Sequence, residues 1–409
     1  MRAVTERLGG VGCGGSSVSP LMRGSAGAKN LYCPSLAHLR LCRSRFYSTA
    51  NVQVPLPLVK ELRAETGAGV MDCRNALAES DNDLGKARKW LLQQTKKKMA
   101  KKQSRVAAEG LVAVSLSADA ARGVMVELNC ETDFVARVPA FQELALAAAR
   151  SVVETPRANV QKKKEEEKEE KGEAVCVEWL QNQRPVFVHS QKKGAATVEE
   201  GIVGLFGQVG EKMVLRRAVE LYAAAEKDAS SVVGGYAHNP PGEYPEVGTK
   251  AALVHLLYQP SSASSSPSTQ RLQRTANLLA RHIARTGPLY TSKEEVPSSV
   301  LQSWKEENAK RGNNSEEEAY RQLALMEQEI VTFPHEEEGE QQQNGGAAEE
   351  ARNEPVKAFL KRQEEKLSGK IAVKQFVRWQ AGEGIEKEEK DFAQQVQEEV
   401  ARAAATVLF

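Results

Sequence analysis

Hydrophobic side chains recur at helical spacing between residues 54 and 95, and this pattern predicts three short helices. The first helix is expected to end in the segment Thr66-Gly67-Ala68-Gly69, because paired glycines permit backbone angles closed to other residues. The polar run Ser80–Asp83 then supplies N-cap residues for the third helix. A module of about forty residues is near the lower limit for independent folding, and modules of this size usually present a surface to a partner.

A basic segment, Lys96–Arg105, follows the predicted helices. It has two interpretations: a strip that binds RNA phosphates, or a solvated linker or helix end. No aromatic residue lies among its lysines to stack on a base, so the pattern favours the second interpretation.

The apolar pattern then changes from helical to alternating. Residues 111–116 and 124–130 predict two strands that a turn joins into an antiparallel hairpin. Pro139 is expected to open a helix, because the N–H that proline lacks has no partner in a first helical turn. A second sheet is predicted from three further strand-like runs, at residues 213–221, 232–236 and 250–257.

Helical patterns return after the Ser-rich stretch at residues 261–268. A helix from Thr269 is expected to bury one face, formed by Leu272, Ala276, Leu279 and Ile283. Acidic helices follow beyond Ser292, and the run Phe376–Gln380 and a terminal helix complete the chain. The pattern predicts an α+β fold in which the three-helix module precedes a two-part core of antiparallel sheets packed with helices.

Composition excludes several classes of protein. Of the 409 residues, 41% are hydrophobic and 27% are charged, as in globular proteins. No stretch approaches the roughly 18 consecutive apolar residues that span a bilayer, so no membrane partner is expected. The formal charge of +2 comes from residues 1–50, which hold seven basic residues and one acidic residue. The remainder has 49 basic and 53 acidic residues, and its net charge of −4 argues against a surface that coats nucleic acid.

Residues 1–50 have the composition of an organellar transit peptide. They are rich in Arg, Ser and Gly, contain a single acid, and lack the apolar core of a secretory signal. The segment Arg45–Ala50 resembles a mitochondrial processing site, with cleavage expected between Tyr47 and Ala50. An extension with no targeting role is the alternative.

Motifs of covalent catalysis are not found in the sequence. It has no phosphate-binding loop, no third glycine after Gly382-Glu383-Gly384, no zincin histidine pair and no Gly-x-Ser-x-Gly elbow. Cys73, Cys130 and Cys176 are too widely spaced to suggest a disulfide framework or a zinc site. Cys130 is the one candidate nucleophile, but an apolar-facing cysteine at a strand end is more often a core residue.

The segment Asn129–Arg137 places Phe134 beside Asp133, directly after a predicted strand. The ring either packs under the following helix with Phe141 or is presented at the end of the hairpin. The pattern alone favours packing with Phe141.

Several motifs resemble those of the translation elongation factor Ts family, and they occur in the family's order. They are Leu62–Leu77, Ala108–Leu111, Glu127–Arg137, Gly210–Arg217, Gly235–His238 and Phe376–Lys387. Together with the leader, they resemble the mitochondrial type of this family.

The resemblance implies a guanine nucleotide exchange factor for elongation factor Tu, the GTPase that delivers aminoacyl-tRNA to the ribosome. It implies that a loop is pushed toward the magnesium and phosphate site of the GTPase, and the matching residues are Thr132, Asp133, Phe134 and Val135. The three-helix module, which is UBA-like in this family, would dock on the nucleotide domain. Its expected docking residues are Arg63, Thr66, Gly67, Gly69, Met71 and Asp72, with Gly67 and Gly69 setting the turn.

The resemblance implies no catalytic residue, metal or cofactor, no covalent step and no direct nucleic-acid partner, and it places the protein in the mitochondrial matrix. The expected divisions of the chain are a transit peptide (1–50), a docking module (54–95), a first core subdomain (105–228) and a second core subdomain with the C-terminal module (229–409). A charged run (157–172) and a low-complexity linker (335–354) appear as insertions in the family pattern.

Two departures from the family stand out. Val138-Pro139 follows Arg137 where a polar residue is usual, and the family's protruding helical hairpin is not readable between residues 300 and 370. Alternatives from other classes are an RNA- or ribosome-binding adaptor that uses residues 96–105, and a hydrolase that uses Cys130, for which the local sequence offers no base.

Overall fold

The computed structural model describes residues 54–162, 172–187, 197–223, 229–261, 269–309, 315–333 and 352–386. Contacts divide the chain into the units Met1–Asn51 and Val52–Phe409, and all described residues belong to the second. The expected transit peptide, much of the charged run, most of the low-complexity linker and the expected terminal helix lie outside the described residues.

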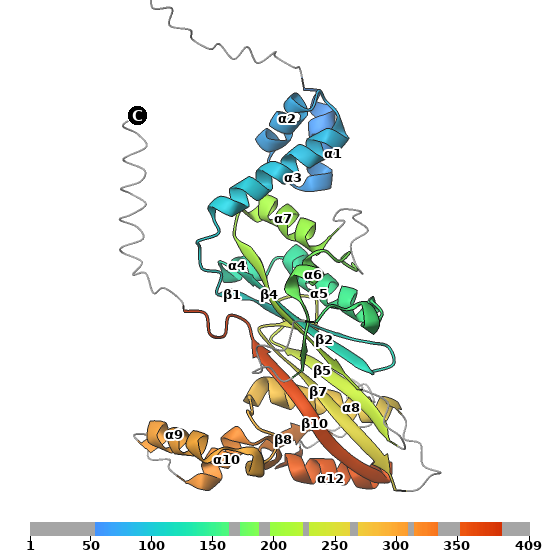
Figure 1. The fold of residues 1–409 in the computed structure, drawn as a ribbon, viewed down its shortest axis with the longest axis vertical. Helices are drawn as coiled ribbons and strands as arrows, with labels where there is room; N and C mark the ends of the chain where they lie inside the picture. Colours follow the sequence, from blue (N-terminus) through green and yellow to red (C-terminus); the bar gives the residue numbers. More distant parts are fainter. Residues whose placement is uncertain are drawn as a thin grey trace, which may run out of the picture. The chain divides into compact units, whose positions relative to one another are not determined.

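Three helices begin the described chain, as the pattern predicts (Figure 1). They are α1 (Leu56–Thr66), α2 (Val70–Glu79) and α3 (Leu84–Lys101). Helix α1 ends at Gly67, whose φ of 69° is left-handed, and the Asp83 carboxylate caps α3 by accepting a hydrogen bond from the Lys86 N–H at 3.0 Å. The helices share a core of their own, formed by Val59, Leu62, Ala68, Cys73, Ala76, Leu77, Ala87 and Leu91.

Helix α3 continues to Lys101, beyond the predicted end of the module at residue 95. Residues 96–101 are therefore a helix end and not an extended linker.

The first sheet has the strand order β3-β4-β2-β1-β6, and every pairing in it is antiparallel. Its strands are β1 (Glu109–Leu116), β2 (Arg122–Cys130), β3 (Glu173–Ala174), β4 (Met213–Tyr222) and β6 (Val247–Gly248). Strands β1 and β2 form the predicted hairpin. The expectation that residues 213–221 belong to the second sheet is wrong, because β4 pairs along the whole length of β2. An apolar run predicts a strand but does not show which edge it joins.

The second sheet has the order β10-β7-β5 and is also antiparallel. Its strands are β5 (Ser230–His238), β7 (Lys250–Pro260) and β10 (Gly369–Gln380). A separate ribbon pairs β8 (Glu329–Thr332) with β9 (Arg352–Pro355). Residues 352–354, the end of the predicted low-complexity linker, are thus in a strand, because β8 supplies backbone partners that the local sequence does not reveal.

Helices complete the described fold. They are α4 (Asp133–Ala136), α5 (Pro139–Glu154), α6 (Val177–Gln181), α7 (Val198–Val209), α8 (Thr269–Thr286), α9 (Ser298–Ala309), α10 (Glu316–Leu323) and α12 (Val356–Leu367), with short 3-10 helices at Arg157–Asn159, Lys293–Glu295 and Leu325–Glu327. The predicted helices at Pro139 and Thr269 are confirmed. Helices α9 and α10 contact each other and are linked by an ion pair of 2.7 Å between Lys305 and Glu316.

The two sheets pack against each other, and helices cover their other faces. Along β1, Leu111 and Ala113 belong to the core that α5 and α7 share, whereas Val112 and Val114 pack in the core between the sheets. Helix α8 covers the other face of β5 and β7 (Figure 1). Residues 111–114 are all apolar, instead of alternating as the pattern analysis expected, because β1 is covered on both faces.

A buried ion cluster joins the C-terminal part of the described chain to the first sheet. The Glu127 side chain on β2 is fully buried (0% exposed) and accepts hydrogen bonds from Arg216 at 2.9 Å and Arg217 at 2.5 Å. Its carboxylate also accepts a hydrogen bond of 2.8 Å from the backbone N–H of Gly382. The Arg217 guanidinium lies 4.3 Å from the centre of the Trp379 ring. A buried carboxylate requires such partners, so Glu127 holds the turn at Gly382 against β2.

His282 of α8 is buried beside the segment that leads into β8. Its Nε2 lies 2.9 Å from Gln328 Oε1. That oxygen also accepts a hydrogen bond from the Thr286 hydroxyl, and the Gln328 amide donates to the Gln322 carbonyl, so His282 Nε2 carries the proton. Burial lowers the pKa of His282 to about 4, an effect that the Gln328 hydrogen bond opposes and the charge of Arg285 reinforces.

We expect His282 to make the fold sensitive to mild acid. Its pKa is lower in the folded chain than in the unfolded chain, so the unfolded chain binds the proton first and stability falls as the pH decreases from about 6.5 toward 4. Between about pH 7 and pH 5, the free energy of unfolding should lose about 2 kcal/mol from this group. Urea unfolding of wild type and His282→Gln at both pH values measures it. The variant should lose correspondingly less, and an equal loss in both proteins would contradict the prediction.

Candidate functional site

The segment expected to be an open loop is a single helical turn. Glu131 and Thr132 separate the end of β2 from helix α4, and Thr132 is at the N-cap position of the helix. The Arg137 N–H closes the turn by donating to the carbonyls of Asp133 and Phe134 at 3.3 and 3.2 Å. Because α5 begins at Pro139, the segment is held between a strand and a long helix.

The four residues Thr132, Asp133, Phe134 and Val135, called the tip below, divide between solvent and core. Phe134 is 76% exposed, and the Asp133 side chain is 53% exposed. Val135 is 5% exposed and belongs to the core cluster that contains Phe141. Packing of Phe134 with Phe141, which the pattern favoured, is therefore wrong. Successive residues of a helical turn point about 100° apart, so Val135 faces the core and Phe134 does not.

The Phe134 side chain contributes little to the stability of the fold, because most of it is exposed. Burying a phenylalanine side chain contributes roughly 1.5–3 kcal/mol, and most of that contribution is not realised here. Singly exposed apolar side chains are common, but this ring stands next to a carboxylate on a turn that is fixed at both ends. Such a ring is available to a partner.

The Asp133 carboxylate is also available. It pairs with Arg137 at 3.0 Å, and the two side chains are 53% and 67% exposed. Exposed pairs at this helical spacing contribute only a few tenths of a kcal/mol, so a partner can replace Arg137 at little cost.

Glu131 and Thr132 form the base of the tip, and hydrogen bonds join them to the segment that precedes β4. The N–H of Thr132 donates to Glu211 Oε2 at 3.1 Å, and its hydroxyl donates to Glu211 Oε1 at 2.9 Å. Beside it, the Glu131 carboxylate accepts hydrogen bonds from the Lys212 N–H at 2.6 Å and from Arg105 at 2.9 Å. The base of the tip is therefore fixed, while its outer residues face solvent.

Cys130 is a core residue, as predicted. It is fully buried, and its thiol donates a hydrogen bond to the Thr132 carbonyl at 3.1 Å. Burial raises the pKa of Cys130 to about 12, with the charges of Glu211 and Glu109 adding to the effect. The thiol is protonated at neutral pH, which argues against a nucleophilic role.

The expected docking residues lie on α1, α2 and the turn between them. Met71 is 62% exposed, and Arg63, Gly67 and Gly69 are also exposed. Thr66 and Asp72 are half-buried and hold local structure. The Thr66 hydroxyl donates to the Leu62 carbonyl at 2.7 Å, and Asp72 pairs with Lys98 at 3.0 Å.

Two exposed apolar residues of the module were not identified from sequence. Leu56 is 73% exposed and Val70 is 48% exposed. Each is the first residue of its helix, where the helical pattern is too short to assign an inward or outward face.

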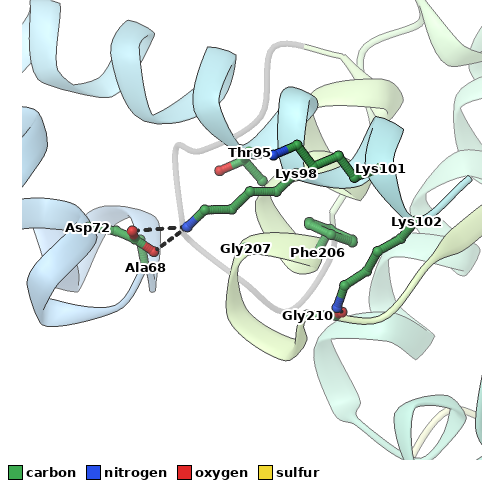
Figure 2. A pocket seen from close by; sticks show the side chains of 9 residues that line it. All are labelled: Ala68, Asp72, Thr95, Lys98, Lys101, Lys102, Phe206, Gly207 and Gly210. Atoms are coloured by element: carbon green, nitrogen blue, oxygen red, sulfur yellow. Dashed lines mark hydrogen bonds and ion pairs between the residues drawn. The ribbon is translucent and has the colours of Figure 1, made fainter. Parts of the chain in front are cut away.

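The basic segment is largely engaged within the protein. Figure 2 shows Lys98 reaching Asp72 and Lys102 reaching Gly210. These residues line a cavity of about 310 Å³, together with other residues of α3 and α7 and with Ala68 of the α1–α2 turn. Lys102 donates to the Gly210 carbonyl, and Lys96 pairs with Glu199 at 2.9 Å. These contacts support the helix-end interpretation over a phosphate-binding strip.

The part of the chain that the structure describes holds no group of three His, Cys, Asp or Glu side chains arranged for a metal ion. In the same residues, no helix is long and apolar enough to cross a membrane.

The comparisons with known proteins agree on one family. The family model for Elongation factor TS matches residues 131–383, a span that contains the tip. A mitochondrial elongation factor Ts from Heterostelium pallidum is 31% identical over 359 residues, which cover 88% of this chain and 87% of the relative. A mitochondrial relative from Dictyostelium discoideum is 30% identical (83% and 89% covered), and elongation factor Ts from Methylocella silvestris is 34% identical (84% and 96% covered).

These matches define a translation elongation factor. The chain belongs to the elongation factor Ts family, and it resembles the mitochondrial type. Its function is accordingly the one that the motifs implied, guanine nucleotide exchange on elongation factor Tu during translation elongation. The RNA-binding alternative has no support from these matches.

Of the two glycines expected to set the docking turn, Gly67 has the conformation that requires glycine. A Cβ at Gly67, where φ is 69°, would lie 2.6 Å from the Gln208 side chain. At Gly69, φ is −59° and the nearest atom to a Cβ would be Asp72 Oδ2, at 3.7 Å.

We therefore expect Gly67→Ala to destabilise the three-helix module by about 1 kcal/mol, because an L-residue is strained at positive φ. Gly69→Ala is the matched control and should be close to neutral. Hydrogen exchange of the amides in residues 54–101 measures both. Equal loss of protection in the two variants would show that the backbone angle at Gly67 is not the cause.

Proposed function

We propose that this chain accelerates GDP release from elongation factor Tu by inserting its tip near the magnesium and phosphate site. Asp133 and Phe134 make the contacts, while Thr132 and Val135 anchor the turn. The observation that carries the proposal is the outward Phe134 ring, 76% exposed, beside a weakly paired carboxylate and adjacent to the buried Val135.

The residue types suit this action. GTPases hold their nucleotide largely through Mg²⁺ and backbone amides around the phosphates. A rigid aromatic ring displaces side chains packed behind that site, and a carboxylate competes for the hydrogen bonds that order the magnesium shell. No covalent bond is made or broken, so the action requires no catalytic residue, cofactor or direct nucleic-acid contact in this chain.

Thermodynamic linkage makes the action reversible. If the factor weakens nucleotide binding, the nucleotide weakens binding of the factor by the same ratio. A coupling free energy of about 3 kcal/mol corresponds to a ratio of roughly 150. A fresh nucleotide can therefore displace the factor and complete the cycle.

The three-helix module supplies affinity in this proposal. Its UBA-like arrangement would dock on the nucleotide domain of the GTPase through the exposed Arg63 and Met71, with Leu56 and Val70 adding apolar contact. The turn residues maintain the docking surface; they are Thr66, Gly67, Gly69 and Asp72. The proposed divisions are a docking module (54–95, whose helix α3 continues to Lys101) and core subdomains (105–228 and 229–409).

Residues 1–50 are proposed to direct the protein to the mitochondrial matrix. Their arginine-rich, acid-poor composition supports a transit peptide. The names of two relatives support a mitochondrial location.

Truncating the outer residues of the tip should slow exchange. Phe134→Ala and Asp133→Ala should each lower the maximal rate of GDP release by roughly tenfold, since each loses an interaction that acts at the nucleotide site. Stopped-flow release of a fluorescent GDP analogue from elongation factor Tu measures this rate. Val331→Ala, which truncates another exposed apolar side chain (45% exposed), is the control. Unchanged rates in both tip variants, with the fold intact, would refute the proposal.

Truncating the docking surface should act on affinity instead. Met71→Ala should raise the half-saturating factor concentration about fivefold, because an interface anchor is lost, and leave the maximal rate within about twofold. The same titration gives both quantities. A fall in maximal rate at constant half-saturation would contradict a docking role for Met71.

A further inference from the structure

Three consecutive residues between α7 and β4 contact both the end of α3 and the base of the tip. Gly210, Glu211 and Lys212 are called the node below. The Gly210 carbonyl accepts a hydrogen bond from Lys102, and the Lys212 ammonium donates to the carbonyls of Gln103 and Arg105 at 2.6 and 2.7 Å. The chain that leaves the docking module is therefore fastened to the node.

The tip is fastened to the same residues. Both oxygens of Glu211 accept hydrogen bonds from Thr132, one from its N–H and one from its hydroxyl. The Lys212 N–H donates to Glu131. Hydrogen bonds to a carboxylate are about twice as strong as those between neutral groups, so these contacts restrict Thr132 strongly.

Thr132 determines the direction of the tip. It has an extended backbone (φ −127°, ψ 154°) and is the last residue before the helical turn that carries Asp133 and Phe134. The Thr132 side chain makes no capping hydrogen bond to α4 and is turned to Glu211 instead. The Phe134 ring lies on the helical turn that follows Thr132. A small rotation of the Thr132 backbone would therefore displace the ring further than it displaces Thr132 itself.

We propose that Glu211 is a positioning residue for nucleotide exchange: by holding Thr132, it fixes the Phe134 ring relative to the docking helix α3. This inference rests on the proposed role of the tip. In this role Glu211 acts through Thr132, from which it accepts its hydrogen bonds. Because the node also holds the end of α3, the position in which the module docks determines where Phe134 is placed.

The test measures GDP release from elongation factor Tu over a range of factor concentrations, which separates maximal rate from half-saturation. Glu211→Ala should lower the maximal rate roughly tenfold, because a displaced group loses its effect on a reacting site steeply with distance. Half-saturation should change less than about twofold, because the docking surface is intact. An unchanged maximal rate would overturn the positioning role.

Glu211→Gln tests whether Glu211 acts through the position of its hydrogen bonds or through its charge. The glutamine oxygen can accept from the Thr132 N–H, and its amide can donate to the Thr132 hydroxyl, so this variant should retain the rate within about twofold. A rate as low as that of Glu211→Ala would overturn the positional explanation. Glu199→Ala is the matched control, because it removes another glutamate, the partner of Lys96 on the α3–α7 surface. It should leave the maximal rate unchanged, and an equal fall there would also overturn the proposal.

Two further measurements separate the possible failures. Hydrogen exchange of residues 131–138 in the free protein should increase in Glu211→Ala and not in Glu199→Ala. If Glu211→Ala does not fold, Thr132→Val replaces it, because that variant removes the hydroxyl donor and preserves the side-chain size. Normal GDP release with both Thr132→Val and Glu211→Gln supports the positional explanation only if residues 131–138 of Thr132→Val stay protected from hydrogen exchange. Normal GDP release by Thr132→Val with that protection lost would overturn the proposal.

The Phe134→Ala variant distinguishes this inference from the function on which it rests. Slow exchange by Phe134→Ala with normal exchange by Glu211→Ala refutes the positioning role and leaves the tip's function standing. Normal exchange by Phe134→Ala refutes the function of the tip, and the positioning role with it.

Discussion

The burial of Val135 is the constraint on which the tip depends. Val135 and Ala136 fill the core beneath the first sheet, and the single turn of α4 leaves no rotation that would also bury Phe134. Strand β2 on one side and α5 on the other prevent the turn from unwinding. The packing of Val135 that stabilises the fold is therefore the same packing that presents the ring, so a change at Val135 affects both stability and function.

Elements with strong periodicity could be predicted from sequence. The three N-terminal helices and helix α8 each bury a regular face, so their hydrophobic patterns are unambiguous. The β1–β2 hairpin is recognisable as two apolar runs joined by a turn, and α5 as an apolar run that opens at a proline. The position of β4 could not be predicted, because its pairing with β2 is a long-range choice between two sheets. Helix α12 and strand β9 are highly charged or short, and they are ordered by tertiary contacts that involve Phe359 and Ile330.

The candidate site was only partly accessible from pattern. Phe134 and Val135 are adjacent apolar residues, and four residues are too few to show the phase of a helical turn. The family motifs, and not periodicity, pointed to an exposed ring. Glu211 lies 79 residues from Thr132 along the chain, so no local signal connects the two. The exposed Leu56 and Val70 were missed for a related reason, since each stands at a helix start.

The hydrogen bond between Gly382 and Glu127 spans 255 residues and has a consequence for biogenesis. A nascent chain emerges from its N-terminus, so β2 with its buried carboxylate is synthesised long before the glycine that completes its coordination. Until then, Glu127 has only the arginines of β4 to offset its desolvation. The first sheet is thus consolidated late, because its core is complete only after the segment that contains Gly382 has been synthesised.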